Sequence, residues 1–475
     1  MKRIQLIFFL LMSFGLVAAH PWKPANYVII DTDGGFDDMR TICMFLASPN
    51  VRVLAITCSN GVVNARDCYK KTKELLSDLH HEGILTGMNE NPEAAAKDCK
   101  PAIDFKWGSS NPEVTPVPDA IGIVEYVLEH TQDPITFISL GSLITASDCS
   151  KRIPAFRQRI KTIAWTADST LDRKNFNFKV SPSSYNYIVH ESGIPLSLIV
   201  GESAINPYNS EYISRATRLY TPEADKVVYS LNRSDPFAKN WFDEMACIFI
   251  HYPVLFNSDT TKTQVVYHLN PSIEVDSLQH YSLTILDGNT VNQNQVLVSF
   301  PMDTSAYFPD VMKKMKSTLQ RYGKDEWVAC VLGNELHRHL GVYAVIGTKM
   351  GIRAREYFGA GVDEFKVLSF AGEVPPYSCL NDGIQVSTGA TLGHGLIHIS
   401  QDTARLPGAY FTYLGQTIEI SLKEEYREKI EKEINDLSSV YSLNSNIYWE
   451  FVRIAALNYW ANWDRHNIFT IRMVK

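Results

Sequence analysis

Hydrophobic positions in the first half of the chain form short, nearly continuous apolar runs, and each run is followed by an amphipathic stretch. Runs of this kind are typical of strands that are covered on both faces. The stretches between them carry apolar residues three and four positions apart, which predicts helices. The alternating order predicts a doubly wound, mostly parallel α/β sheet. The expected strands are 27–30, 51–58, 134–142, 161–168 and 195–201, and the expected helices are 37–48, 65–79 and 119–131.

The pattern changes in the second half of the chain. Short β-like runs predict strands at 263–270, 281–286 and 295–300. Beyond them, helical spacing alternates with Gly-punctuated stretches, which predicts a second domain of α+β class. We place the domain boundary near residue 310, so that 20–310 and 311–475 form the two domains. In the second domain we expect helices at 309–323, 339–359 and 421–437 and a strand at 366–373.

The first nineteen residues have the layout of a secretory signal. Two basic residues precede an apolar run, and small residues end at Ala19, where cleavage is expected. The alternative is a membrane anchor, for which the apolar run is short. We therefore expect an exported, soluble, periplasmic or extracellular protein without a stable membrane anchor.

Composition narrows the classes of partner. The net charge is −7 and no long Lys/Arg run is present, so a nucleic-acid partner is not expected. Eight widely spaced cysteines without a CxxC motif do not form a disulfide framework, although one or two bridges are compatible with an oxidising compartment.

An acidic loop follows the first expected strand. Asp31, Asp33, Asp37 and Asp38 lie within eight residues, and Gly34-Gly35 allows a tight turn between them. Such carboxylates repel one another unless a cation binds them, a basic side chain pairs with them, or they cap backbone N–H groups. Oxygen ligands favour a hard cation such as Ca²⁺. The alternative is a solvated turn with a helix cap.

The loop DTDGGFDD resembles the signature of the nucleoside hydrolases (inosine-uridine preferring nucleoside N-ribohydrolases). Three later segments, TFISLGSL, NFNF and WFDEMACIF, resemble further motifs of that family in the same order, over about residues 27–260. The resemblance implies N-glycosidic hydrolysis of a small riboside. It also implies a Ca²⁺ site, with Asp33 as general base and Asp37 and Asn177 on the ribose. The ligands that it implies are Asp33, Asp38, Asp243 and the main-chain carbonyl of Leu140.

The residue types suit that chemistry. Cleavage of an N-glycosidic bond passes through an oxocarbenium-like sugar, so positive charge develops on the ring. Clustered carboxylates stabilise this charge, while a metal ion positions and acidifies the attacking water.

The sequence departs from the family pattern on the side of the leaving group. Phe242 stands where a His often precedes the last metal ligand, and Asn175 stands where the family has Glu. Base specificity is therefore open. Trp165, Phe242 and Asn175 are candidate substrate contacts, with a core position as the alternative for the aromatic residues.

Residues 330–400 resemble a metal-binding domain family named after one of the subunits of formylmethanofuran dehydrogenase, on the segments HRHLG and CLNDGIQVSTGATLGHG. Candidate ligands for Zn²⁺ or another transition metal are His337, His339, Cys379 and His394. The alternative is a scaffold without metal whose histidines make hydrogen bonds. We also expect a homodimer, with the apolar helix 340–358 and the aromatic segment 448–460 as candidate surfaces.

Two other functions compete with the hydrolase. A strand that ends in Asp-x-Asp-Gly also resembles haloacid-dehalogenase-type phosphatases, in which Asp31 would be the nucleophile. Asp31→Asn should abolish a phosphatase but only weaken a nucleoside hydrolase. The third hypothesis is a non-catalytic nucleoside- or sugar-binding protein.

Overall fold

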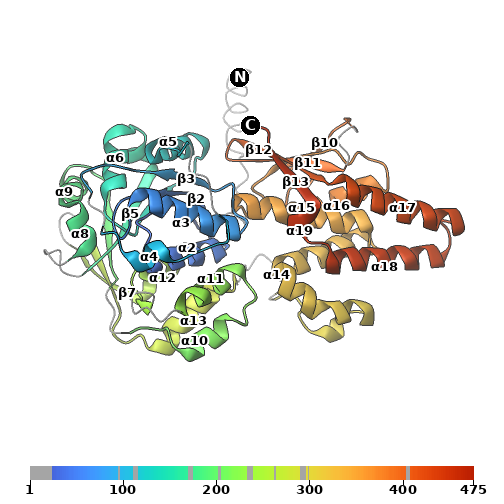
Figure 1. Ribbon diagram of the computed structural model, residues 1–475, viewed down its shortest axis with the longest axis horizontal. Coiled ribbons are helices and arrows are strands. Elements are labelled where there is room, and N and C mark those ends of the chain that lie inside the picture. The colour runs from blue at the N-terminus through green and yellow to red at the C-terminus, as the bar shows by residue number, and fades with distance from the viewer. Residues whose placement is uncertain are drawn as a thin grey trace, which may run out of the picture.

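The computed structural model describes residues 24–94, 97–110, 116–168, 175–201, 205–232, 239–260, 264–288, 296–297, 299–402 and 407–475. The predicted signal segment 1–19 lies outside these residues. Two sheets organise the chain, one in each half of the molecule (Figure 1).

The first sheet has eight strands in the order β3-β2-β1-β4-β5-β6-β8-β7, and every neighbouring pair is parallel except β7 and β8. The strands are β1 (Asn26–Thr32), β2 (Val51–Cys58), β3 (Leu85–Met88), β4 (Ile135–Ser139), β5 (Ile160–Ala167), β6 (Leu196–Val200), β7 (Phe256–Thr260) and β8 (Val265–Leu269). In β1, Val28 and Ile30 pack into one core and Ile29 packs into the core on the opposite face. Burial on both faces explains the continuous apolar run, and the predicted α/β fold is confirmed.

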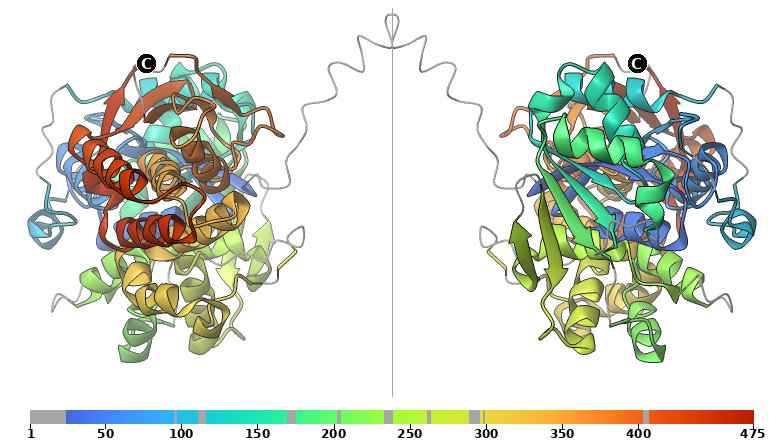
Figure 2. Two further views of the ribbon diagram at one scale, coloured as in Figure 1. Left: turned by 90° about the vertical axis from the view of Figure 1, so that its right-hand side faces the viewer. Right: turned by 90° about the vertical axis from the view of Figure 1, so that its left-hand side faces the viewer.

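Helices cover both faces of this sheet (Figure 2, right). One face is covered by α2 (Phe36–Ala47), α3 (Ala65–Asp78), α4 (Lys100–Asp104), α10 (Ser210–Ala216), α11 (Pro222–Leu231), α12 (Glu244–His251) and α13 (Val275–Leu286). The other is covered by α5 (Ala120–His130), α6 (Ile144–Arg152), α7 (Phe156–Arg159), α8 (Phe176–Val180) and α9 (Pro182–His190).

Two of the β-like runs differ from the prediction. Residues 281–286, predicted as a strand, form the last turns of α13, so that prediction is wrong. Leu278 begins the buried stripe of that helix upstream of the run, and six apolar-rich residues alone cannot distinguish a strand from a buried helix. In the run 295–300, the described residues 296–297 and 299–300 belong to no strand.

The second half contains a five-stranded sheet in the order β10-β9-β11-β12-β13, in which only the pair of β9 and β10 is parallel. Its strands are β9 (Lys366–Ser369), β10 (Ile397–Ile399), β11 (Gly408–Tyr413), β12 (Gln416–Leu422) and β13 (Phe469–Met473). Its helices are α14 (Pro309–His337), α15 (Val342–Phe358), α16 (Leu380–Thr388), α17 (Glu424–Val440), α18 (Asn446–Asn462) and α19 (Arg465–Ile468). A short 3₁₀ turn, η4 (Tyr377–Cys379), also belongs to this half, whereas the 3₁₀ turns η2 (Pro253–Leu255) and η3 (Thr304–Ala306) precede α14.

Helix α15 lies in the core of the second half. Every residue from Val342 to Ala354 is buried, because α15 packs against α14, α16 and α18. The prediction that helix 340–358 offers a dimer surface is therefore wrong.

The two halves contact each other through charged side chains. The guanidinium of Arg353 donates to both carboxylate oxygens of Glu82, at 2.9 and 3.0 Å. Arg52 Nε lies 2.6 Å from Glu364 Oε2. The domain boundary near residue 310 stays a prediction, and it falls where α14 begins. No helix among the described residues combines the length and the apolarity needed to span a bilayer.

Candidate functional site

The candidate site lies where β1, β2 and β4 end side by side. Strand β1 is flanked by β2 and β4, so the strand order reverses direction at this point. Loops that follow such a switch point form a crevice in which ligands bind. Asp33 follows β1, Gly61 follows β2 and Leu140 follows β4.

Two glycines shape the acidic loop. Gly34 has a φ of +84°, and a Cβ there would lie 2.8 Å from the side chain of Val63. A Cβ at Gly35 would lie 2.6 Å from Asp38 Oδ2 and 2.7 Å from Asp37 Oδ1. Glycine at position 35 therefore lets both carboxylates of the first turn of α2 lie close to the loop.

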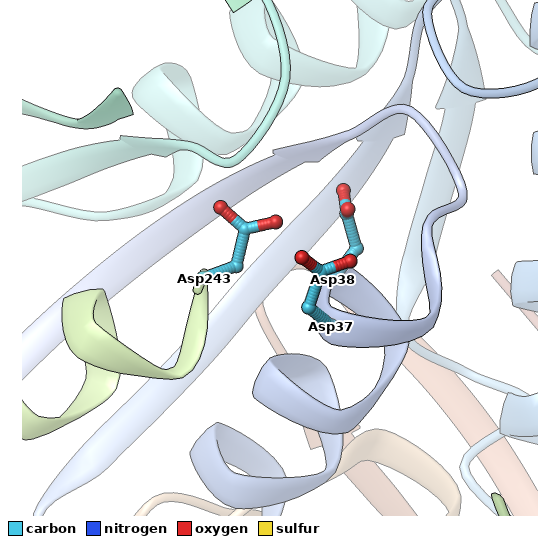
Figure 3. Close-up of side chains that lie close together, drawn as sticks. All are labelled: Asp37, Asp38 and Asp243. Carbon is cyan, nitrogen blue, oxygen red and sulfur yellow. The ribbon is translucent and has the colours of Figure 1, made fainter. Parts of the chain in front are cut away.

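Asp37, Asp38 and Asp243 converge from two helices (Figure 3). Each offers a carboxylate oxygen, and these oxygens lie within 4.8 Å of one another, in the only such group of three among the described residues. Asp243 immediately precedes α12, about two hundred residues after Asp38. The predicted meeting of Asp38 with Asp243 is thus present in the fold, with Asp37 in the group.

Asp33 lies beside this group. Its side chain is buried, and neither carboxylate oxygen has a hydrogen-bond partner among the described residues. Gly61 and Gly141 enclose the carboxylate, because a Cβ on either residue would crowd it, at 3.0 Å in the case of Gly141. Asp38, in contrast, accepts hydrogen bonds from Thr32 Oγ1 at 2.7 Å and from the Asp33 N–H at 3.0 Å.

Two other predicted site residues, Leu140 directly after β4 and Asn177 of α8, are connected to the same group. Asn177 Nδ2 donates to the main-chain carbonyls of Leu140, at 2.7 Å, and of Thr166, at 3.0 Å. The hydroxyl of Thr166 donates to Asp243 Oδ1. The fold therefore gathers Leu140, Asn177 and Asp243 around Thr166, a residue to which no sequence motif points.

Burial and mutual repulsion dominate the electrostatics of the site. Burial raises the pKa of Asp33, and the charges of Asp38 and Asp37 raise it further. The pKa of Asp243 is also raised well above its usual range, first by burial and then by the charges of Asp38 and Asp37. Burial and the charge of Asp38 raise the pKa of Asp37 to about 7. A divalent cation fits these residues because it would neutralise the repulsion, and a donor set of oxygen atoms suits a hard ion.

We expect the stability of the chain to depend on pH in opposite directions with and without a divalent cation. Carboxylates with a raised pKa bind protons more tightly in the folded than in the unfolded chain. When a chelator has removed the metal, the stabilisation from proton binding is complete below about pH 4. For Asp37 it is lost as the pH rises through about 7. Ca²⁺ at a thousand times its Kd should instead add roughly 4 kcal/mol. Differential scanning calorimetry should show the gap in unfolding temperature between Ca²⁺ and EDTA widening from pH 5 to pH 8, and a constant gap would contradict a carboxylate site.

A buried ion pair fastens the two helices that carry the acidic group. Arg40 Nε lies 2.7 Å from Glu244 Oε1, and both side chains are fully buried. Tyr208 joins the pair, since its hydroxyl accepts from Arg40 at 3.1 Å and donates to Glu244 at 2.7 Å. Arg40 lies on α2 two residues after Asp38, and Glu244 directly follows Asp243. This connection could not be predicted from the sequence, because about two hundred residues separate its members.

The remaining candidates of the first domain have structural contacts. Trp165 is fully buried, and its indole N–H donates to the Gly141 carbonyl at 2.8 Å, which favours a core role over stacking on a base. Asn175 is also buried, and it caps α8 by accepting from the Phe178 N–H at 3.0 Å. Phe242 is half-buried, with its ring against Gly201. Asp31 is fully buried and accepts hydrogen bonds from Thr57 Oγ1 and Ser59 Oγ at 2.6 and 2.9 Å.

The second-domain candidates do not assemble into one ligand set. Among the described residues, His337, His339, Cys379 and His394 form no group of three ligand atoms within 4.8 Å of one another. His337 Nδ1 lies 2.8 Å from Asp382 Oδ2, and its ring lies 4.3 Å from that of His339. His394 lies elsewhere, with its Nδ1 3.3 Å from Asp363 Oδ1. All eight cysteines, which lie in the described ranges, are free thiols.

The fold and the gathered carboxylates define an α/β protein with a set of acidic oxygen ligands at the switch point of its parallel sheet. The sequence model of the inosine-uridine preferring nucleoside hydrolases matches residues 28–308, which is more than half of the chain, and the chain belongs to this family. A second model, described as FmdE, molybdenum formylmethanofuran dehydrogenase operon, matches residues 336–469. Both predicted resemblances are confirmed.

Individual relatives are more distant. The pyrimidine-specific ribonucleoside hydrolase RihA of Escherichia coli K12 is 26% identical over 181 residues, which cover 36% of this chain and 58% of the relative. The chain thus spans little more than half the length of the curated relatives that it matches. Two solved structures are similar: an inosine-uridine preferring nucleoside hydrolase from Bacillus anthracis (TM-score 0.44, 16% identity, 56% of this chain, 100% of that chain) and a purine-preferring ribonucleoside hydrolase from Gardnerella vaginalis (TM-score 0.44, 14% identity, 55% of this chain, 98% of that chain).

Proposed function

We propose that the chain is an exported, calcium-dependent hydrolase that cleaves the N-glycosidic bond of ribonucleosides or related ribosides and releases base and ribose. The observation that carries the proposal is the convergence of Asp37, Asp38 and Asp243 beside Asp33, whose buried oxygens have no hydrogen-bond partner among the described residues. Family membership supports the reaction class. Export rests on the pattern of residues 1–19, and a secreted chain that begins at His20 would support it.

Each acidic residue has a proposed role. Asp33, Asp38, Asp243 and the Leu140 carbonyl would hold Ca²⁺, and Asp37 would bind a ribose hydroxyl because it is the most exposed of the four carboxylates. When bound, the ion would acidify a water molecule and orient the ribose diol. Asp33 would accept the proton of the attacking water, since neither of its carboxylate oxygens has a hydrogen-bond partner among the described residues. Asn177 would turn its amide towards a ribose hydroxyl.

The same carboxylates would favour the transition state over the bound substrate. Positive charge develops on the ribose ring as the glycosidic bond lengthens. Buried carboxylates fixed around the ring stabilise this charge without reorganising at the moment of reaction. No covalent intermediate is required. A phosphatase reaction through Asp31 is not supported, because that side chain is fully buried and bonded to Thr57 and Ser59.

The leaving group departs on the side of Phe242. This side chain cannot donate a proton, so a base that needs protonation to leave receives no help from position 242. General acid catalysis contributes about 10²–10⁴-fold where it operates. We therefore propose that the preferred substrates carry a leaving group that departs without protonation.

A panel of ribosides graded by the acidity of the leaving group tests the proposal. We expect release of ribose in Ca²⁺, loss of release in EDTA, and recovery when Ca²⁺ is added back. A nitrophenyl riboside should react at least about 10²-fold faster than inosine, since its phenolate leaves unprotonated. Ribose release is measured by a reducing-sugar assay. Phosphatase activity without ribose release, or tight riboside binding without turnover, would overturn the proposal in favour of one of its two competitors.

A further inference from the structure

The outward face of α18 carries large apolar side chains that stay partly exposed in the described chain, and the ring of one of them, Phe451, stacks on Tyr441 at 5.4 Å. Ile447, Phe451 and Ile454 are 49%, 40% and 62% exposed. Their spacing of four and three residues places them on one stripe of the helix. The opposite stripe, which includes Val452 and Ala456, is buried in the core of the second domain. Helix α18 is therefore apolar on its outer face as well as on its inner one, which is unusual for a surface helix.

Phe451 and Ile454 of this stripe lie on the floor of a groove. Helix α18 packs against both α14 and α17, at the end of the molecule remote from the first sheet (Figures 1 and 2). The groove has a volume of about 790 Å³. Its apolar lining comes from the end of α17 and the outer face of α18: Leu437, Val440, Tyr441, Phe451, Ile454, Ala455 and Leu457.

The two edges of the groove have opposite charge. Lys313 and Lys314 line it from α14, and Glu433 and Asp436 line it from α17. Within the described part of the chain, no ion-pair partner is found for Lys313, Lys314 or Asp436. The acid of α14, Asp310, is already bonded to Arg453 at 2.8 and 3.0 Å. An apolar stripe thus runs between a basic edge and an acidic edge.

We propose that a second copy of this chain occupies the groove, so that two α18 helices pair across a two-fold axis. A two-fold rotation about the stripe places the basic edge of each copy opposite the acidic edge of the other, which makes the surface self-complementary. Burial of the apolar side chains stabilises the pair, and the charged edges set its orientation. An anionic membrane would instead favour a face with basic charge alone. This proposal is independent of the proposed enzymatic activity.

Sedimentation equilibrium of the full mature chain tests the pairing. We expect a mass of two chains for the unaltered protein and of one chain for Ile454→Glu, because a buried charge would stand in the middle of the contact. Val254→Glu is the matched control, since Val254 is 87% exposed on η2 in the first domain and the dimer should persist. A monomeric unaltered chain, or an Ile454→Glu variant that stays dimeric, would overturn the proposal. Binding of a monomeric chain to phosphatidylglycerol vesicles would also overturn it.

Exchange of charge between the edges tests the orientation. The variant K313E/K314E and the variant D436K should each sediment as monomers, because like charges then face each other across both halves of the contact. A mixture of the two should form dimers, because glutamates at positions 313 and 314 then face the lysine at position 436. Glu433 is left unchanged, since it also accepts a hydrogen bond from Tyr459. Failure of the mixture to dimerise would refute the two-fold arrangement, and circular dichroism of each variant shows whether it is folded.

Discussion

Asp33→Asn is expected to lower riboside hydrolysis by about 10²–10⁴-fold, the usual contribution of a general base. The amide has nearly the shape of the carboxylate, so the enclosure by Gly61 and Gly141 is kept. It removes the charge and the proton-accepting oxygen together. Because Asp33 is buried against other carboxylates, the neutral side chain should also raise the unfolding temperature in EDTA at pH 8. Initial rates of ribose release and calorimetry measure the two effects.

A loss of activity together with a rise in unfolding temperature would distinguish a catalytic role of Asp33 from a structural one. A residue needed only for folding would lower activity and stability together. Asp104→Asn is the matched control, because Asp104 is an exposed residue of α4 whose ion-pair partner among the described residues is Lys100, at the surface. Such a pair contributes about 0–1 kcal/mol, so both activity and stability should stay near those of the unaltered chain. An Asp33→Asn variant with normal turnover would remove Asp33 from the mechanism.

The local parts of the site could be predicted from the sequence. The run before Asp31 breaks from apolar to acidic where β1 ends, and this break locates the crevice in a parallel sheet. Gly34 and Gly35 signal the turn because only glycine tolerates the backbone and the close carboxylates there. Strand β2 matches its predicted bounds at both ends, since burial on both faces leaves an unbroken run.

Parts of the structure that depend on tertiary packing could not be predicted in this way. The run 281–286 and helix 340–358 are apolar in the sequence, but composition does not say whether a helix lies at the surface or in the core. Trp165 could have faced a ligand or the core, and its hydrogen bond to Gly141 exists only because β4 and β5 are neighbours. Arg40 could not be paired with Glu244 from the sequence, because an ion pair between distant segments leaves no periodic pattern.

The second large effect is expected from breaking the buried ion pair between Arg40 and Glu244. Arg40→Met leaves Glu244 buried without its partner, which costs about 3–5 kcal/mol of folding free energy. The double variant R40M/E244M should recover most of that stability, since a buried pair replaced by apolar side chains of similar volume is often neutral. If the pair also positions the acidic group, the double variant should still bind Ca²⁺ at least about 10-fold more weakly, as is usual when groups that orient metal ligands are lost. Calorimetry and isothermal titration with Ca²⁺ separate the two quantities.

Lys349→Met provides the matched control for this experiment. Lys349 and Glu326 form a second fully buried pair, but they lie on α15 and α14 in the other half of the chain. Lys349→Met should cost less stability than Arg40→Met, because Glu326 keeps Arg465 as a partner at 2.9 Å. It should leave the Ca²⁺ affinity unchanged, because neither helix carries a member of the acidic group. A double variant R40M/E244M with normal Ca²⁺ affinity would show that the pair only balances charge in the core. A weakened affinity at restored stability would instead mean that the distance between α2 and α12, fixed by Arg40 and Glu244, sets how well Asp38 and Asp243 meet around the ion.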